Sequence, residues 1–267
     1  MPDIEWILLY LVLGAFVGFM AGLLGLGGGG ILVPLLSSIF TYQGISADNA
    51  IHLALGTSLA CMIVSSTASI RAHTSQRTVV WPAVGGMAPG VIAGGFLAAQ
   101  AAAHINSICI AIFFALLMAA VAGQMLLNWR PEPSLKPLTF CRLIAAGIGI
   151  GSVSALAAVG GGFLAVTYLG YKNVNIKSAI GTSAAIGLPI AITGTIGYMI
   201  SGWSITLSNP YTVGFIDVPA FLAIAFTSAI AASYGTRCSH NLPDAFLRKI
   251  FATISLFLSI KMLLFLV

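Results

Sequence analysis

Apolar residues run through the chain in long stretches, separated by short polar or Pro/Gly-rich segments. A helix of about 20 apolar residues crosses a hydrocarbon core of roughly 30 Å. The pattern predicts ten helical segments, at residues 4–26, 30–41, 48–71, 78–100, 105–127, 139–158, 161–170, 176–200, 213–235 and 246–266. The second and seventh are too short to span a bilayer alone, and each directly follows a glycine cluster. The sequence therefore predicts an all-α polytopic membrane protein.

Composition excludes a water-soluble fold. Hydrophobic residues make up 59% of the 267 residues and charged residues only 6%, whereas soluble domains carry about 25% charged residues. The first segment has no basic region before it and no clear cleavage site, so we expect it to remain as a membrane helix. The net charge of +5 comes from basic residues that stand singly between apolar segments. They resemble topology signals, and nucleic acid is not an expected partner.

Three motifs occur twice in the same order, which indicates an internal duplication. Gly28-Gly29-Gly30-Ile31-Leu32 matches Gly160-Gly161-Gly162-Phe163-Leu164, Gly56-Thr57-Ser58 matches Gly181-Thr182-Ser183, and Trp81-Pro82-Ala83 matches Val218-Pro219-Ala220. The sequence predicts a first membrane repeat at 1–127, a cytoplasmic linker at 128–138 and a second membrane repeat at 139–267.

The basic residues test the topology. If each glycine cluster lies inside one simple spanning helix, the basic residues divide almost evenly between the two faces, against the positive-inside rule. If each cluster turns the chain back as a hairpin, each repeat has five segments, the repeats are inverted, and all basic residues except Lys261 face the cytoplasm. These are Arg71, Arg77, Arg130, Lys136, Arg142, Lys172, Lys177, Arg237, Arg248 and Lys249. A hairpin in the second half alone would also place these ten residues on the cytoplasmic side, with the N-terminus inside. The internal duplication favours two hairpins.

The glycine clusters are the candidate site. Non-helical backbone at membrane depth is tolerated only where it is buried in protein or lines a cavity. A helix that restarts after such a break points its first free N–H groups and its positive dipole end at the break. Two facing half-helices could therefore hold a small anion near the midplane. The alternative, close helix packing, better suits the isolated stripes Gly14, Gly18 and Gly22, and Gly86, Gly90 and Gly94.

Substrate binding is predicted for two kinds of donor. Backbone amides would come from Gly27, Gly28, Gly29, Gly30, Gly160, Gly161 and Gly162, and hydroxyls from Thr57, Ser58, Thr182 and Ser183. For the hydroxyls, a bond to the helix's own carbonyl one turn back is the open alternative. A second hydroxyl patch, Ser65, Ser66, Thr67 and Ser69, ranks lower because only Thr193 corresponds to it in the second repeat.

Charged side chains offer weaker candidates. His52 and Lys177 occupy matching positions before the two Gly-Thr-Ser motifs and are expected near opposite faces, as gates or as sources of positive potential. Arg71 and Arg237 lie at the expected cytoplasmic mouth, and the alternative for all four is a helix-end anchor. No acidic residue falls at a helix centre, which disfavours a cation pathway. No catalytic motif or metal-spaced Cys/His cluster is present, so the sequence predicts no enzyme, metal or cofactor.

The paired glycine and Gly-Thr-Ser motifs, with Pro34 and His52, resemble the sulfite exporter (TauE/SafE-like) membrane transporter family over essentially the whole chain. The resemblance implies transport of a small sulfur-containing anion, such as sulfite or an organosulfonate, through a bacterial inner membrane. The second repeat departs from the first, with Val166 where Pro34 would recur and Lys177 in place of the histidine. We therefore expect two unequal half-sites.

The sequence thus predicts a secondary transporter that exports its anion by alternating access, with the lipid bilayer as surroundings and a homodimer left open. One alternative is a carrier or channel for another small anion, such as a carboxylate. From other classes, a membrane enzyme is disfavoured by the lack of a paired acid and base. A non-catalytic membrane subunit is disfavoured by the lack of extended loops.

Overall fold

The computed structural model describes residues 4–24, 27–102, 104–127, 139–203 and 211–265, and this part of the chain is almost entirely helical. The helices are α1 Ile4–Leu24, α2 Gly29–Tyr42, α3 Ala47–Ser75, α4 Trp81–Ala102, α5 Ser107–Leu126, α6 Phe140–Ala157, α7 Gly162–Tyr171, α8 Ile176–Ser201, α9 Val218–Asn241 and α10 Asp244–Leu264. Each corresponds to one predicted segment. The predicted linker at 128–138 lies outside the described residues.

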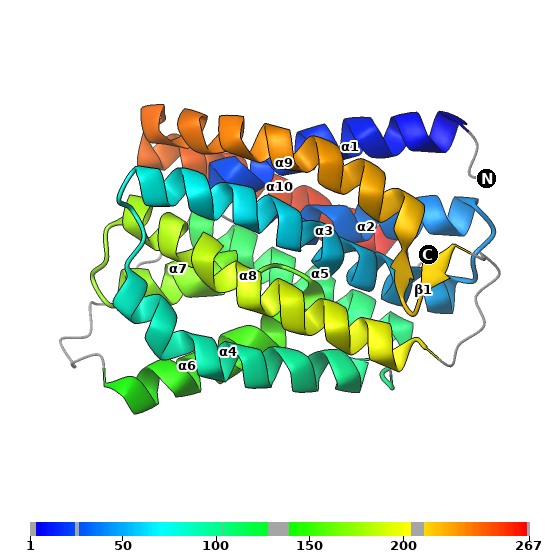
Figure 1. Cartoon of the computed structure of the whole chain (residues 1–267), viewed down its shortest axis with the longest axis horizontal. Coiled ribbons are helices and arrows are strands. Elements are labelled where there is room, and N and C mark those ends of the chain that lie inside the picture. Colours follow the sequence, from blue (N-terminus) through cyan, green and yellow to red (C-terminus); the bar gives the residue numbers. More distant parts are fainter. Residues whose placement is uncertain (1–3, 25–26, 103, 128–138, 204–210, 266–267) are drawn as a thin grey trace.

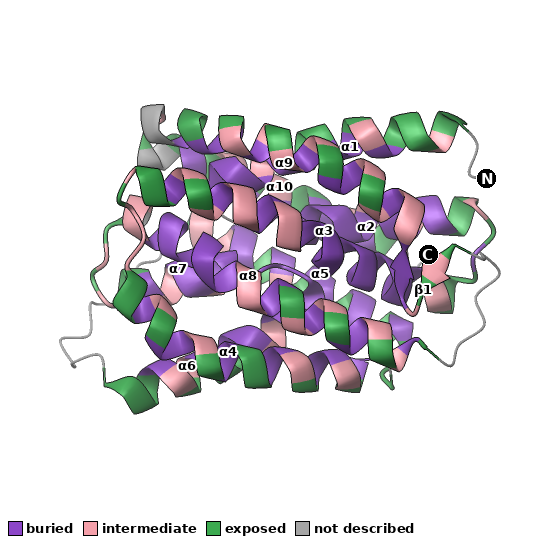
Figure 2. Cartoon of the chain, viewed as in Figure 1, coloured by how far each residue is buried: buried purple, intermediate pink, exposed green. Residues whose placement is uncertain are grey.

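The helices form a bundle in which most run along its long axis (Figure 1). Seven of the described helices, α1, α3, α4, α5, α6, α8 and α9, are long and apolar enough to cross a membrane. α3 and α8 are the most buried of them and pack against each other in the middle of the bundle, whereas the outer helices expose one side (Figure 2). The fold is therefore that of an all-α multi-pass membrane protein, as predicted.

Helix contacts recur between the two halves of the chain. α1 packs on α9 as α6 packs on α4, α3 packs on α9 as α8 packs on α4, and α2 packs on α3 as α7 packs on α8. Corresponding helices also begin at opposite ends of the bundle, since α1 begins at the right of Figure 1 and α6 at the left. These contacts are those expected of two related halves. Their inversion across a bilayer stays a prediction.

The isolated glycine stripes serve close helix packing, which confirms that interpretation of them. A Cβ on Gly18 would overlap the backbone of Ser228 on α9, and one on Gly90 would overlap the backbone of Ile144 on α6. Both stripes are thus occupied within a single chain. A homodimer would need another surface.

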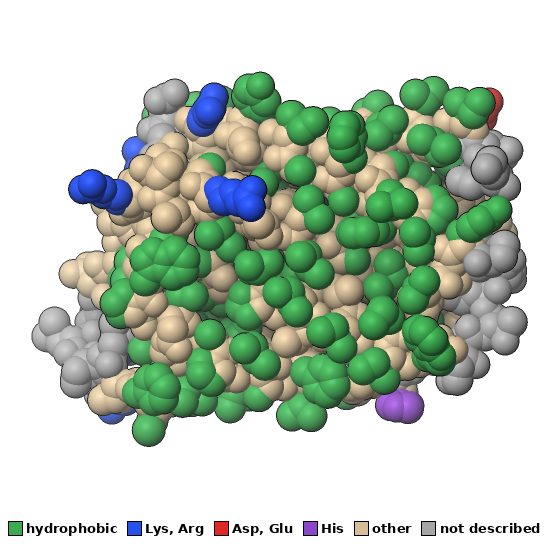
Figure 3. Space-filling view, viewed as in Figure 1, with side chains coloured by type: hydrophobic (Ala, Val, Ile, Leu, Met, Phe, Trp, Pro, Cys, Tyr) green, Lys and Arg blue, Asp and Glu red, His purple; other side chains and the backbone are tan. Residues whose placement is uncertain are grey.

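The chain reverses at each glycine cluster. α1 begins at the right end of the bundle, and α2 ends there, beside the turn that leads into α3 (Figure 1). On the visible face, Lys and Arg side chains gather at the left end and the middle is covered by hydrophobic side chains (Figure 3). The connections from α3 to α4, from α7 to α8 and from α9 to α10 also lie at the left end, and the first two carry Arg77 and Lys172.

The predicted start of the ninth segment is wrong. Residues Thr212–Val213 (β1) and Ile216–Asp217 (β2) pair as a small antiparallel hairpin, so α9 begins at Val218 rather than at residue 213. Asp217 caps the helix, since its carboxylate accepts a hydrogen bond of 2.9 Å from the backbone N–H of Ala220. The sequence from residue 213 onward does not reveal this hairpin, because a two-residue strand is too short to show a periodic pattern of apolar residues.

Candidate glycine-break site

Each glycine cluster ends one helix and starts another through left-handed backbone. Gly27 and Gly28 have φ of 69° and 78°, and Gly28 is the N-cap of α2. Gly160 and Gly161 have φ of 72° and 67°, and Gly161 is the N-cap of α7. L side chains rarely adopt such angles, which explains glycine at these positions.

The backbone geometry aligns the two clusters differently from the sequence motifs. It matches each residue of the first cluster to a residue of the second that lies one position later than the motif match. The N-caps Gly28 and Gly161 correspond, so Phe163 stands where the first cluster has Gly30, and Thr167 where it has Pro34. The sequence-based pairing of Pro34 with Val166 is therefore corrected. The helix start depends on the left-handed glycines rather than on the Ile-Leu or Phe-Leu pair that follows.

The two breaks touch each other in the interior. A Cβ on Gly29 would overlap the carbonyl oxygen of Ala158, and one on Gly30 would lie 3.4 Å from a methyl group of Val159. On the other side, a Cβ on Gly187 of α8 would lie 2.8 Å from the carbonyl oxygen of Gly160. The predicted glycines of both clusters, Gly27, Gly28, Gly29, Gly30, Gly160, Gly161 and Gly162, are thus brought to one region.

Backbone donors point into this region. The N–H groups of Ile31 and Leu32 bond the carbonyl of Gly28 at 3.2 and 3.3 Å, which closes the first turn of α2. The N–H groups that precede them in a helix have no partner within it, and they carry the positive end of the helix dipole. α7 begins in the same way, with Ala165 N–H bonded to Gly161 at 2.8 Å. Both helix starts therefore direct the positive ends of their dipoles at this region, which also contains the carbonyl oxygens of Ala158 and Gly160.

Hydroxyl groups of α3 line the same region. Ser65 donates a 2.7 Å hydrogen bond to the carbonyl of Gly27 and so holds the first break against α3. Ser66 Oγ lies 3.1 Å from the Cβ position of Gly27 and 3.5 Å from that of Gly187, which itself contacts Gly160. Ser66 is fully buried, and its hydroxyl has no hydrogen-bond partner among the described residues. A buried hydroxyl between the two breaks with no partner in the described part of the chain is suited to a ligand.

Five further buried hydroxyls lack a partner among the described residues, those of Ser58, Ser69, Ser154, Thr167 and Tyr198. Ser69 lies one turn beyond Ser66 on α3, and Ser154 lies in the last turn of α6, just before the second break. The lower-ranked hydroxyl patch on α3 therefore contributes more to this site than the Gly-Thr-Ser motifs do. No local signal marks this patch, because contacts made far along the chain place Ser66 beside Gly27 and Gly187.

Thr57 and Thr182 lie elsewhere and join the two halves. Thr57 Oγ1 accepts a 2.9 Å hydrogen bond from the backbone N–H of Asp217, and Thr182 Oγ1 accepts one of 2.9 Å from Val80. Asp217 and Val80 each precede one of the matched Pro-containing helix starts. The two bonds are therefore equivalent in the two halves, and they give both threonines a structural role.

The neighbouring serines lie one turn before residues that contact the breaks: Met62, beside Gly27, follows Ser58, and Gly187, beside Gly160, follows Ser183. Ser183 donates to the carbonyl of Ile180 at 2.8 Å, the local bond that was the open alternative. Ser58 Oγ is buried with no partner among the described residues, but it lies eight residues before Ser66 on α3, a rise of about 12 Å. Ser183 therefore has a local partner, and Ser58 is set back from Gly27 by one helical turn relative to Met62.

The predicted cationic residues also lie away from the breaks. His52 is held by the carbonyls of Asp48 and Ala102, with ring nitrogens 2.9 and 3.1 Å from them, and it stacks on Phe215. Lys177 is half-buried at the start of α8, so the two residues belong to opposite ends of the bundle, as expected. Arg71 and Arg237 line a groove between α3 and α9.

A multi-pass helical bundle whose two interrupted hairpins meet at their helix starts has the architecture of a membrane transporter. The family model described as Sulfite exporter TauE/SafE matches residues 10–262, and the chain belongs to this family.

Relatives agree with this class. A probable membrane transporter protein of Haemophilus influenzae is 34% identical over 97% of this chain and 98% of its own length. One of Methanocaldococcus jannaschii is 26% identical over 96% and 95%. A third, from Bacillus subtilis, is 24% identical over 87% and 90%. No solved structure matches the chain.

Proposed function

We propose that this transporter exports a small sulfur oxyanion, sulfite or an organosulfonate, across a bacterial inner membrane, and that the anion binds where the two glycine breaks meet. The observation that carries the proposal is the buried, unpartnered Ser66 hydroxyl between the breaks. The family description and the names of the relatives support transport, and the chemistry of the site supports an anion.

The electrostatics of the site favour an oxyanion. Helix starts supply N–H donors and a positive dipole end, and hydroxyls supply further donors, so an anion can be held without a buried cation. The carboxylates with described side chains, Glu5, Asp48 and Asp217, belong to segments at the right end of the bundle in Figure 1, away from the breaks. Oxyanions with three oxygens and an apolar or lone-pair side suit a site whose donors lie among apolar residues such as Met62 and Val159.

Flux measurements in proteoliposomes test the proposal. We expect uptake of sulfite and of a small organosulfonate to exceed that of sulfate and acetate, and to be accelerated by the same anion on the opposite side. Trans-stimulation indicates a carrier, since a channel does not show it. Selectivity for sulfate, acetate or a cation would contradict the proposed substrate, while flux without trans-stimulation would contradict alternating access.

Orientation in the membrane is proposed from the basic residues. With the left end of Figure 1 in the cytoplasm, the positive-inside rule is obeyed, and α1 begins outside. A reporter fused ahead of Ile4 should then be active only outside the cytoplasm, and one inserted after Leu127 only inside it. A cytoplasmic N-terminal reporter would contradict the inverted arrangement of the two halves.

A further inference from the structure

A groove of about 530 Å³ lies between the second half of α3 and α9, on the side of α3 that faces away from the glycine breaks. Its α3 residues recur at Ile63, Thr67, Arg71 and Ser75, one stripe of the helix. The hydroxyls of Ser66 and Ser69 belong to the neighbouring, buried stripe. The groove is therefore separate from the proposed transport site.

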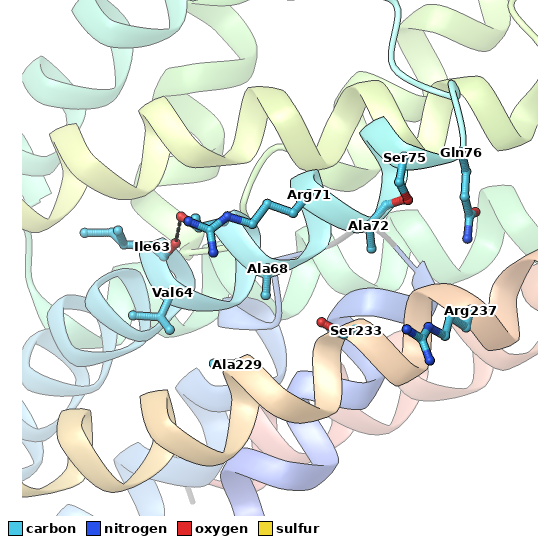
Figure 4. A pocket seen from close by; sticks show the side chains of 11 residues that line it. Ile63, Val64, Ala68, Arg71, Ala72, Ser75, Gln76, Ala229, Ser233 and Arg237 are labelled. Atoms are coloured by element: carbon cyan, nitrogen blue, oxygen red, sulfur yellow. Dashed lines mark hydrogen bonds between the residues drawn. The ribbon is translucent and has the colours of Figure 1, made fainter.

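The lining of the groove is partly apolar and partly cationic. Ile63, Val64, Ala68 and Ala229 form one part of it, and Ser75, Gln76, Ser233 and Arg237 form the part toward the basic end of the bundle. The Arg71 side chain extends toward Ile63 (Figure 4). Figure 4 shows Arg71 on α3 and Arg237, with Ser233, on the facing helix α9. Both arginines are exposed, and no carboxylate is among the lining residues. The groove therefore combines two cationic side chains with an apolar floor.

The corresponding groove of the other half has no such character. By the matched motifs, α8 corresponds to α3 and α4 to α9, so Ile192 and Ile196 stand where the first half has Thr67 and Arg71. Both isoleucines are 40% exposed. Phe96 stands at the position of Ser233, and Gln100 at that of Arg237. The paired arginines are thus a property of one groove and are not required by the way these helices pack.

We propose that the α3–α9 groove binds an anionic phospholipid of the inner leaflet, with its phosphate between Arg71 and Arg237 and part of an acyl chain along the Ile63–Ala229 floor. Guanidinium groups bind phosphate oxygens with paired N–H donors, and Ser233 adds a hydroxyl. Basic pockets between membrane helices on the cytoplasmic side are suited to such headgroups. A soluble oxyanion could bind between Arg71 and Arg237 but would leave the apolar floor of the groove unfilled.

Native mass spectrometry and thermal unfolding of the purified full chain, with added phosphatidylglycerol or phosphatidylcholine, test this site. We expect retained phosphatidylglycerol and a higher melting temperature with it than with phosphatidylcholine. The double variant Arg71→Gln/Arg237→Gln should bind phosphatidylglycerol at least about tenfold more weakly, because each cation near an anionic surface contributes measurably. The control Lys172→Gln/Lys249→Gln removes the same charge at the same end but outside the groove, and should bind as the wild type.

A second variant keeps the proposal testable if the arginine variant fails to fold. Ser233→Phe places in this groove the side chain found at the matched position 96, keeps both charges and fills the space. It should lose the preference for phosphatidylglycerol over phosphatidylcholine. Equal loss in the Lys172/Lys249 control, unchanged binding by Ser233→Phe, or equal arginine-dependent stabilisation by inorganic phosphate without lipid would each overturn the proposal.

Discussion

α3 and α8 hold corresponding places beside the two glycine breaks, yet only α3 presents hydroxyls to them. Ser65 and Ser66 of α3 correspond to Ile190 and Ala191 of α8. Ser65 bonds the carbonyl of Gly27, whereas the side chain of Ile190 packs against Gly161, 2.5 Å from the position of its absent Cβ. A duplicated framework has thus become one polar and one apolar wall, and an anion between them would be held unequally.

Filling the breaks should have the largest effect. Gly29→Leu would force a side chain into the carbonyl of Ala158, where the backbone has no room to move aside. We expect anion flux to fall to the background of empty liposomes, measured at equal amounts of inserted protein. The control Gly170→Leu adds the same side chain in α7 where nothing lies within 4 Å, and should retain flux. Normal flux in Gly29→Leu would refute the placement of the site.

Removing the hydroxyl from the polar wall should have the next largest effect. Ser66→Ala deletes a donor that would bond a charged ligand, an interaction worth about 1.5 to 3 kcal/mol. The KM for flux should rise by about tenfold or more, with little change in stability, because the hydroxyl has no partner among the residues that the structure describes. Ser65→Ala should differ by lowering stability as well, since Gly27 would lose its hydrogen bond. An unchanged KM in Ser66→Ala would place the anion elsewhere.

Removing a hydrogen bond between the two halves should change the stability of the protein and not its affinity for the anion. Thr57→Val leaves the buried backbone N–H of Asp217 without an acceptor, which costs about 1 to 3 kcal/mol. The melting temperature in detergent should fall by several degrees while the KM stays constant. Thr57→Ser, which keeps the hydroxyl, is the matched control. A raised KM at unchanged stability would restore Thr57 to the binding site.

The equivalent bond in the other half should contribute less. Thr182 accepts from Val80, which is half-buried, so in Thr182→Val water can satisfy part of the lost bond. We expect the same direction of change in melting temperature as for Thr57→Val, but a smaller one. A larger loss at Thr182 would show that burial of the donor does not set the difference between the halves.

The helices were predictable because their signals are local. Apolar length and the glycine clusters depend on neighbours in the chain, so ten segments and both chain reversals follow from the letters. The hydrogen-bond and packing partners of a side chain do not follow from its neighbours in the sequence. Ser58 and Ser66 are both serines in an apolar helix, and only contacts made far along the chain place Ser66 between Gly27 and Gly187. Thr57 likewise has its partner 160 residues away, at Asp217.

The central claim, an oxyanion bound between the two breaks, is tested most directly by equilibrium binding of sulfite to purified wild type, Ser66→Ala and Ser201→Ala. Ser201 lies on α8 and donates to the carbonyl of Gly197, so its replacement controls for the loss of a serine away from the site. The account predicts binding by the wild type and Ser201→Ala, and binding about tenfold or more weaker in Ser66→Ala. Equal dissociation constants in all three proteins would contradict it.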